Sequence, residues 1–314
     1  MQNLLFAIGS VLPVFLMVGV GWFIRKKDFI TKEYCSVSAR FNFRFCFPAL
    51  VFDSLYSSDI SRLFTGKLAA LALLALAITL ALSVAGGYAA TKDRQARGSF
   101  IQGAFRGNIV LMAMPMVLQV FGEESRAQTA IIMAIIVPSY NVISVLILTL
   151  SVKGKKVVRP MEIARSILTN PMIIGVLAAL PFALTGTGLP RALTVFIKYF
   201  AGMTVPLALL DIGAGMVGRS RPKNAGKVIF ASLIKTVAGP VVYGGVFALG
   251  GMDDHLVALM VLLGSAPTAM AGFTMAKVMG CDAELAGDIV LVTTLISAFT
   301  IAASIAFLRF VGLA

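Results

Sequence analysis

The chain of 314 residues is too apolar to cover itself with a polar surface. Hydrophobic residues make up 59% of it, charged residues 13%, and the mean hydropathy is +0.93, whereas soluble proteins carry about 25% charged residues. This composition excludes a soluble globular protein and predicts a chain embedded in a lipid bilayer. The net charge of +13 does not indicate nucleic-acid binding, because the basic residues fall in short loops and do not alternate with aromatic residues.

Ten apolar stretches approach the length of about 20 residues that a helix needs to cross a bilayer. The first is too long for a signal-peptide core and lacks a basic start, so we expect an uncleaved span. The second is the weakest, because Arg40, Asn42 and Arg44 interrupt it. The stretches lie at roughly 4–24, 36–52, 68–90, 99–121, 127–152, 167–184, 195–217, 228–249, 256–279 and 289–311.

Lysine and arginine are unevenly divided between the two sides of these spans. Most of them follow the first, third, fifth and seventh spans, and few lie in the alternate loops. The more basic side faces the cytoplasm. The pattern therefore predicts a plasma-membrane protein with both termini outside.

Corresponding landmarks recur at one spacing along the chain. Pro48 and Pro206, Asp53 and Asp211, and Gly122 and Gly280 are each 158 residues apart. Ten spans divide into five and five, and a unit with an odd number of spans enters the membrane upside down when it is repeated. We therefore predict an all-α membrane protein of two inverted five-helix repeats, 1–152 and 167–314, joined by a cytoplasmic loop over 153–166.

The fourth and ninth predicted spans are both interrupted, over 105–115 and 263–273. Paired breaks in the two halves of a chain are the best sequence indication of a transporter's binding site. A helix that starts after a break presents N–H donors, which favour an anion. A simple kink is the alternative for each proline taken alone. The predicted crossover and hinge residues are Gly107, Pro115, Pro267 and Gly272.

Two buried arginines are the candidate partners of a carboxylate, whose two oxygens match the arginine fork. Arg106 begins the first break. Arg44 lies one helical turn after Arg40; Arg40 is expected to snorkel to the interface, and for Arg44 a substrate contact and a structural ion pair both stay open. The predicted substrate-binding residues are Arg106, Asn108, Arg44, Asn141, Ser265, Pro267 and Thr268.

Other polar residues inside the spans have two interpretations each. Asp211 and Asp53 either pair with arginines or hold a cation or proton. Thr294 and Ser297 either join helices or line a cation site. We accordingly keep Asp211, Thr294 and Ser297 as candidates for coupling to Na⁺ or H⁺.

Lys235 lies about two turns into the eighth span, and we expect its side chain to snorkel to the inner interface. His255 follows two aspartates in an outer loop, where we expect it to be solvated. The three cysteines lack metal or redox spacing, and no nucleophile elbow, HExxH or Walker motif is present. We therefore expect no enzyme activity, no metal and no cofactor.

The order of these motifs resembles the auxin efflux carrier family, the bacterial relatives of plant PIN proteins within the bile acid/arsenite/riboflavin transporter superfamily. The similarity covers essentially the whole chain. It rests on the segments 47–52, 107–115, 121–123, 137–141, 169–171, 205–208, 265–269, 279–286 and 293–297.

This resemblance implies that the fourth and ninth helices cross at the bilayer centre. It also implies a scaffold of helices 1, 2, 6 and 7, often a homodimer interface, beside a moving bundle, and carriage of small organic anions such as malonate or malate. Arg106 and Arg44 match no family motif, and the long central loop of the plant members is absent, so we do not expect auxin as substrate.

The prediction is therefore a secondary transporter of a small dicarboxylate that works by crossover-elevator alternating access. A sodium-coupled organic anion symporter of the bile-acid type is the main alternative, with a sodium site near Asn108, Asn141, Thr294 and Ser297. An anion channel would show ohmic conductance, and a membrane sensor would bind its ligand without net transport.

Overall fold

The computed structural model describes residues 2–56, 65–152, 161, 168–169, 171–218 and 224–313. Within these ranges the chain is helical, with one isolated β-bridge and no strand, which confirms the all-α prediction. The predicted connecting loop over 153–166 lies outside the described residues except for Met161. Arg62, Asn170 and the basic segment 219–223 also lie outside them.

Five helical segments in the described part of the chain are long and apolar enough to cross a membrane. They coincide with the predicted third, fifth, seventh, eighth and tenth spans. They contain α5 (Gly66–Ala90), α8 (Arg126–Ser151), α11 (Arg191–Gly215), α12 (Ala225–Leu233) with α13 (Gly239–Leu249), and α16 (Ala283–Phe310).

The predicted first, second and sixth spans are helical as well. They correspond to α1 (Gln2–Lys26), to α2 (Lys32–Phe41) followed by α3 (Phe47–Tyr56), and to α10 (Pro171–Thr185). The helix of the second span begins at Lys32, before the predicted start at 36. A π-helical turn, η1 (Asn42–Cys46), joins its two parts, and the Asn42 amide in this turn donates to the Thr204 carbonyl of α11 at 2.9 Å.

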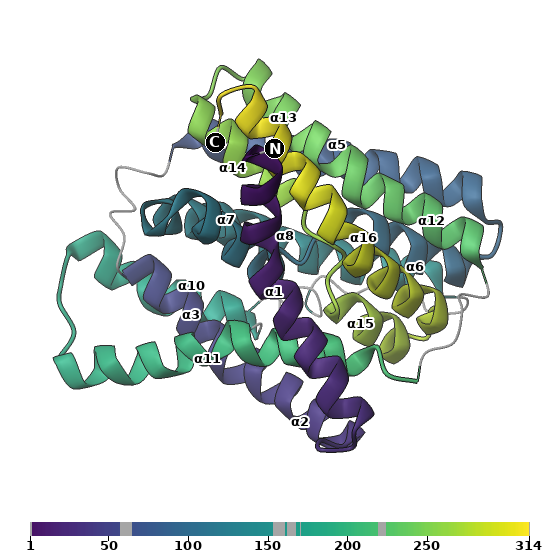
Figure 1. Cartoon of the computed structure of the whole chain (residues 1–314), viewed down its shortest axis with the longest axis horizontal. Helices are drawn as coiled ribbons and strands as arrows, with labels where there is room; N and C mark the ends of the chain where they lie inside the picture. Colours follow the sequence, from purple (N-terminus) through teal and green to yellow (C-terminus); the bar gives the residue numbers. More distant parts are fainter. Residues whose placement is uncertain are drawn as a thin grey trace.

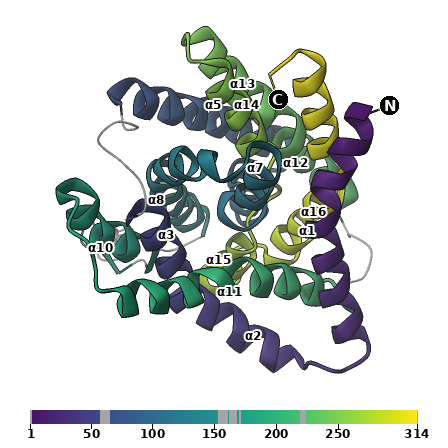
Figure 2. The ribbon, with the colours of Figure 1, turned by 60° about the vertical axis from the view of Figure 1, so that its left-hand side comes forward.

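Helices α1, α2, α3, α10 and α11 form one group, in which α1 packs along α11 and α10 along α3 (Figures 1 and 2). Glycines make the closest approaches. A Cβ atom on Gly21 of α1 would collide with the backbone of Leu210, and one on Gly213 of α11 would collide with Val18. These two backbones therefore touch directly, as small residues allow in membrane helices.

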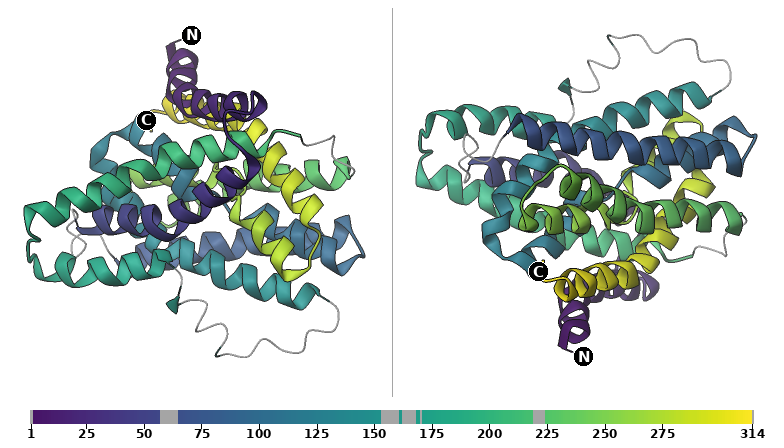
Figure 3. Two further views of the ribbon diagram at one scale, coloured as in Figure 1. Left: turned by 90° about the horizontal axis from the view of Figure 1, so that it is seen from below. Right: turned by 90° about the horizontal axis from the view of Figure 1, so that it is seen from above.

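The remaining helices form a second group. It contains α5, α8, α12, α13 and α16 together with the two interrupted pairs, α6 (Arg94–Phe105) with α7 (Met114–Phe121), and α14 (Asp254–Gly264) with α15 (Ala271–Met279). In this group α6 packs against α5, α8, α12, α15 and α16. The two ends of the chain lie on the same side of the molecule (Figures 1 and 3).

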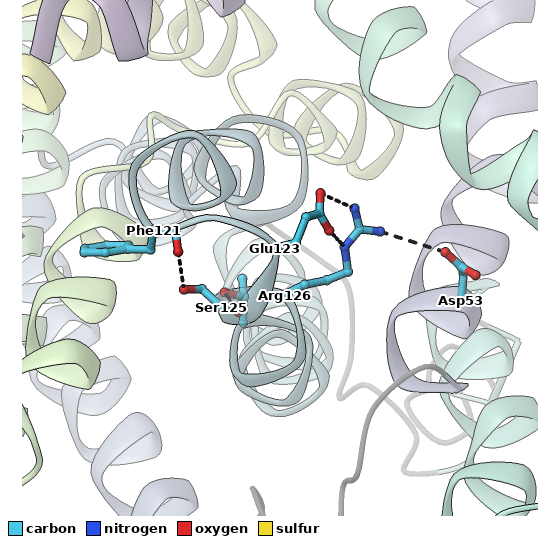
Figure 4. Close-up of polar contacts among 6 residues, drawn as sticks. Asp53, Phe121, Glu123, Ser125 and Arg126 are labelled. Atoms are coloured by element: carbon cyan, nitrogen blue, oxygen red, sulfur yellow. Dashed lines mark hydrogen bonds and ion pairs between the residues drawn. The ribbon is translucent and has the colours of Figure 1, made fainter. Parts of the chain in front are cut away.

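An ion-pair network joins the two groups at one end of α8. The Arg126 guanidinium contacts both carboxylate oxygens of Glu123, at 2.6 and 2.9 Å, and lies 3.9 Å from Asp53 of α3 (Figure 4). Asp53 thus has the arginine partner that the sequence suggested. His255, which was expected to be solvated, is partly exposed, and its ring packs against Phe121 while its Nε2 lies 3.1 Å from the Ser125 hydroxyl.

Two glycines that are 158 positions apart end the helices after the two breaks. Gly122 ends α7 with φ of +79° and ψ of −180°, whereas Gly280 ends α15 in the left-handed region, with φ of +81° and ψ of 24°. Both have a positive φ, which glycine adopts without a steric penalty. Pro48 and Pro206 both lie inside helical segments. The inverted repeat itself stays a prediction.

Candidate functional site

The two interruptions of the fourth and ninth predicted spans meet at the centre of the second group. Helix α6 ends at Phe105 and α14 ends at Gly264, and Gly107 pairs with Thr268 in an isolated antiparallel bridge. The Asn108 amide donates to the Pro267 carbonyl at 2.7 Å, and the Ala269 amide donates to the Arg106 carbonyl at 3.1 Å. The two breaks therefore cross and satisfy each other's backbone groups.

This pairing satisfies the backbone groups that lose their hydrogen bonds when a helix is broken inside a membrane. Lipid offers no hydrogen-bond partners, so backbone groups freed by a break must be satisfied within the protein. Thr268 contributes further, since its hydroxyl donates to the Gly103 carbonyl at 2.6 Å and its amide donates to the Thr293 hydroxyl of α16 at 3.1 Å. The crossing is thereby fixed to both α6 and α16.

Arg106 is the charged side chain at the first break, and it is 6% exposed. Its Nη2 donates to Asn141 Oδ1 of α8 at 2.7 Å, and its Nη1 contacts Ser144 Oγ at 3.3 Å and Met275 Sδ of α15 at 2.8 Å. Among the described residues no carboxylate lies within ion-pair distance of this guanidinium. The positive charge is therefore held by neutral atoms and is not cancelled by them.

Asn108 and Gln102 bring two amides to the same region. Asn108 precedes the π-helical turn η2 (Ile109–Ala113), and in the described structure its side chain makes no capping bond to that turn. Gln102 lies one helical turn before Arg106 on α6; its Nε2 lies 3.6 Å from Met275 Sδ, and its buried Oε1 has no described hydrogen-bond partner. A buried amide oxygen without a partner is costly, which is consistent with a site that is completed by a ligand or water.

Lys235 is also part of the crossing, which corrects the expectation that it snorkels to the interface. It is 1% exposed, and its Nζ donates to the Gly264 carbonyl, at the end of α14, at 3.0 Å. It lies in a π-helical turn, η4 (Ile234–Ala238), between α12 and α13. The hydroxyls of Tyr140 and Tyr243 are hydrogen-bonded at 3.1 Å. They lie close to Lys235, because a Cβ on Gly107 would be 3.3 Å from Lys235 Nζ and 3.4 Å from the Tyr140 hydroxyl.

The predicted hinge residues fall at different places. Gly107 and Pro267 are in the crossing itself. Gly272 lies in the first turn of α15, where a Cβ would approach the Gln102 side chain to 3.6 Å. Pro115 lies in the first turn of α7, directly after the π-helical turn η2. Its role as a hinge stays a prediction.

Several predicted site residues are not joined to Arg106 by any described contact. The hydroxyl of Ser265 contacts the Val261 carbonyl and Ser304. Thr294 and Ser297 donate to carbonyls of their own helix, at 2.7 and 2.8 Å. Asp211 of α11 accepts a hydrogen bond from the Ser38 hydroxyl of α2 at 2.9 Å, where an arginine had been favoured as its partner.

Arg44 is the one predicted substrate contact with an exposed side chain. It lies in η1 at the start of α3, in the group of α1, α3 and α11. Of the two arginines, the structure therefore brings only Arg106 to the crossing. The described residues also contain no cluster of three histidine, cysteine or acidic side chains that could hold a metal.

The site includes residues that the sequence analysis did not select. Gln102 had a usable signal, because it precedes Arg106 by four residues and therefore lies on the same face of a helix. Thr293 was part of a hydroxyl-rich segment, but sequence could not show which hydroxyl faces the crossing. Ser144 and Met275 had no signal, since neither residue type is unusual in a membrane helix.

Comparison with known proteins bears directly on this geometry. A family model described as "Membrane transport protein" matches residues 6–305. The chain belongs to this family. The match confirms the family resemblance drawn from the sequence motifs, and it identifies this member of the membrane transport protein family as a transporter and not an enzyme.

One curated relative carries a more specific name. The chain is 26% identical over 298 residues to a protein of Rhizobium meliloti (strain 1021) named "Putative malonate transporter", and the alignment covers 93% of each chain. The likeness of this membrane transport family member to that protein extends over both breaks.

Proposed function

We propose that this membrane transport protein is a secondary active carrier of a small organic anion, a dicarboxylate of the malonate or malate type. The observation that carries the proposal is the Arg106 guanidinium, which is buried at the crossing and held only by neutral groups among the described residues. A buried charge without a partner costs several kcal/mol, and a bound carboxylate would supply the missing charge.

The crossing adds a second reason for an anionic substrate. Asn108 contributes a side-chain amide that caps no helix in the described structure, and π-helical and α-helical turns begin directly after the break. The positive ends of half-helices and free amide donors suit a carboxylate. The name of the Rhizobium meliloti relative agrees with a substrate of this class.

The proposed architecture is ten membrane helices in two inverted repeats, with both termini outside the bacterial inner membrane. In this proposal α1, α2, α3, α10 and α11 are the scaffold, which forms a homodimer, and the second group moves against it in an elevator cycle. The positive φ of both Gly122 and Gly280, at the ends of α7 and α15, and the division of the helices into two packed groups support this arrangement.

Uptake of radiolabelled malonate into proteoliposomes tests the substrate and the site together. We expect Arg106→Ala with Asn108→Ala to lower uptake at least roughly tenfold, since each hydrogen bond to a charged group is worth about 1.5–3 kcal/mol. Arg44→Ala is the matched control, because it removes an exposed arginine and should leave uptake unchanged. Equal uptake by the double mutant and the wild type would refute the site.

The coupling ion is tested in the same vesicles with imposed gradients. A sodium-coupled symporter would need oxygens that converge on a cation near Asn108, Asn141, Thr294 and Ser297. In the described structure Asn141 Oδ1 already accepts from Arg106, and the hydroxyls of Thr294 and Ser297 are bound to their own helix. Because the hydroxyl oxygens of Thr294 and Ser297 keep lone pairs for a cation, uptake that needs a sodium gradient would identify the sodium-coupled alternative.

A further inference from the structure

A lysine lies inside the crossing, in a place where the proposed carrier does not use it. Lys235 is 1% exposed and belongs to the π-helical turn η4. Its Nζ lies between the two breaks, 3.0 Å from the Gly264 carbonyl of the second and 3.3 Å from the position of a Cβ on Gly107 of the first. It therefore touches both halves of the crossing.

The carbonyl that Lys235 contacts has lost its normal helical partner. In a continuous helix the Gly264 oxygen would accept from the amide of Thr268, but that amide donates to the Thr293 hydroxyl. Helix α14 ends at this residue, so its last carbonyls carry the partial negative charge of a helix C-terminus. Lys235 supplies a hydrogen-bond donor at the point where one is missing.

The surroundings of Lys235 are shaped to admit this side chain. A Cβ on Gly239 would lie 3.5 Å from Lys235 Nζ and 2.8 Å from the Gly264 oxygen. A Cβ on Gly107 would lie only 3.3 Å from Lys235 Nζ, so the glycine at this position leaves space that the lysine occupies. Within the described residues no acidic side chain lies in ion-pair distance of Lys235, so the helix end is its compensating partner.

Carbonyls at the ends of broken helices are the groups that coordinate Na⁺ or H⁺ in secondary transporters. We propose that the Lys235 ammonium is a built-in cation, which occupies the position at the end of α14 where a carrier of this geometry would otherwise bind a monovalent metal ion. The carrier then binds its anion without sodium. The consequence for transport rests on the proposed function; the occupancy of the cation position does not.

Thermal unfolding of the purified protein, in sodium chloride and in choline chloride at equal concentration, tests the proposal without a substrate. The wild type should unfold at the same temperature in both salts. Lys235→Ala empties the position, so it should unfold roughly 5 °C or more below the wild type in choline. Sodium, lithium or potassium should raise that temperature in a saturable manner.

Two further variants separate ion binding from general effects. Lys235→Met removes the charge but fills the space, so it should unfold early in every salt without recovery. Lys227→Ala removes a lysine from the same segment, on α12, outside the crossing, and should behave as the wild type. If Lys235→Ala cannot be purified, the unfolding temperatures of the wild type and Lys235→Met in the two salts test the proposal.

A sodium-dependent rise in the unfolding temperature of the wild type would overturn the proposal. A Lys235→Ala protein that no monovalent cation restores, or a Lys235→Met protein as stable as the wild type, would overturn it as well. Because these readouts use no substrate, an absence of malonate uptake would refute the proposed substrate and leave this inference standing.

Discussion

The Asn108 amide and the Pro267 carbonyl, 2.7 Å apart, join two segments that are remote in sequence at the point where both helices are broken. This bond joins two backbone groups, and so does the second bond of the crossing, in which the Ala269 N–H donates to the Arg106 carbonyl. The side chains of Arg106 and Asn108 are therefore not needed to hold the crossing together through these bonds. The Arg106 side chain contacts Asn141, Ser144 and Met275 instead, all of them neutral partners.

Gly264→Ala should destabilise the protein at the crossing. A Cβ at this position would lie 2.9 Å from both the Gly239 oxygen and the Pro240 Cα, and backbone cannot move aside as a flexible side chain does. Overpacking of this kind costs about 1–3 kcal/mol. The midpoint of thermal unfolding in detergent measures the effect, and Gly245→Ala is the control, because nothing lies within 4 Å of its Cβ position. Equal midpoints for the two variants would contradict the close packing of α14 against α13.

Gln102→Leu should separate transport from stability. Leucine removes a buried amide oxygen that has no described partner, so the unfolding temperature should stay the same or rise. Malonate uptake should fall roughly tenfold if this amide contacts the substrate beside Arg106. Gln95→Leu changes the same residue type on the exposed face of α6 and should leave uptake intact. Full uptake by Gln102→Leu would show that the amide is outside the substrate site.

The contact between α1 and α11 should be intolerant of any side chain. Gly21→Ala and Gly213→Ala each place a Cβ against backbone of the opposite helix, and we expect each to lower the unfolding temperature by roughly 5 °C or more. Gly19→Ala in α1 and Gly202→Ala in α11 are matched controls, since their Cβ positions have no neighbour within 4 Å. A loss of stability in the controls of the same size would argue against a specific contact.

The ion pair between Asp53 and Arg126 should contribute little to stability. The two groups are 3.9 Å apart, and the Arg126 side chain is 30% exposed, so solvent screens their attraction. A double-mutant cycle with Asp53→Asn and Arg126→Gln should give a coupling free energy of about 0–1 kcal/mol. A coupling well above this range would mean that Arg126 pairs more closely with Asp53 than with Glu123.

The breaks could be predicted from sequence, but their pairing could not. Glycine and proline at 107 and 267 disturb helices by their own backbone properties, which is a local effect. The spacing of 158 residues makes Arg106 the sequence equivalent of Gly264. In the structure, however, the bridge forms between Gly107 and Thr268. The exact register depends on which backbone groups meet in space, and no sequence pattern encodes that.

Lys235 shows why depth along a span does not determine burial. Its position two turns into the eighth span suggested an aliphatic chain long enough to reach the interface. The π-helical turn η4 places the residue against the broken end of α14 instead, where a carbonyl needs a donor.

The bridge between Gly107 and Thr268 has a consequence for biosynthesis. When the first break enters the membrane, the second lies about 160 residues further along the chain. At a synthesis rate of about 5–20 residues per second, the delay is roughly 8–30 seconds. During that interval the Asn108 amide and the Arg106 carbonyl need partners other than those in the finished protein. The first break is therefore inserted before its hydrogen-bond partners exist. The insertion machinery or trapped water must bond to its free backbone groups until the ninth helix is inserted.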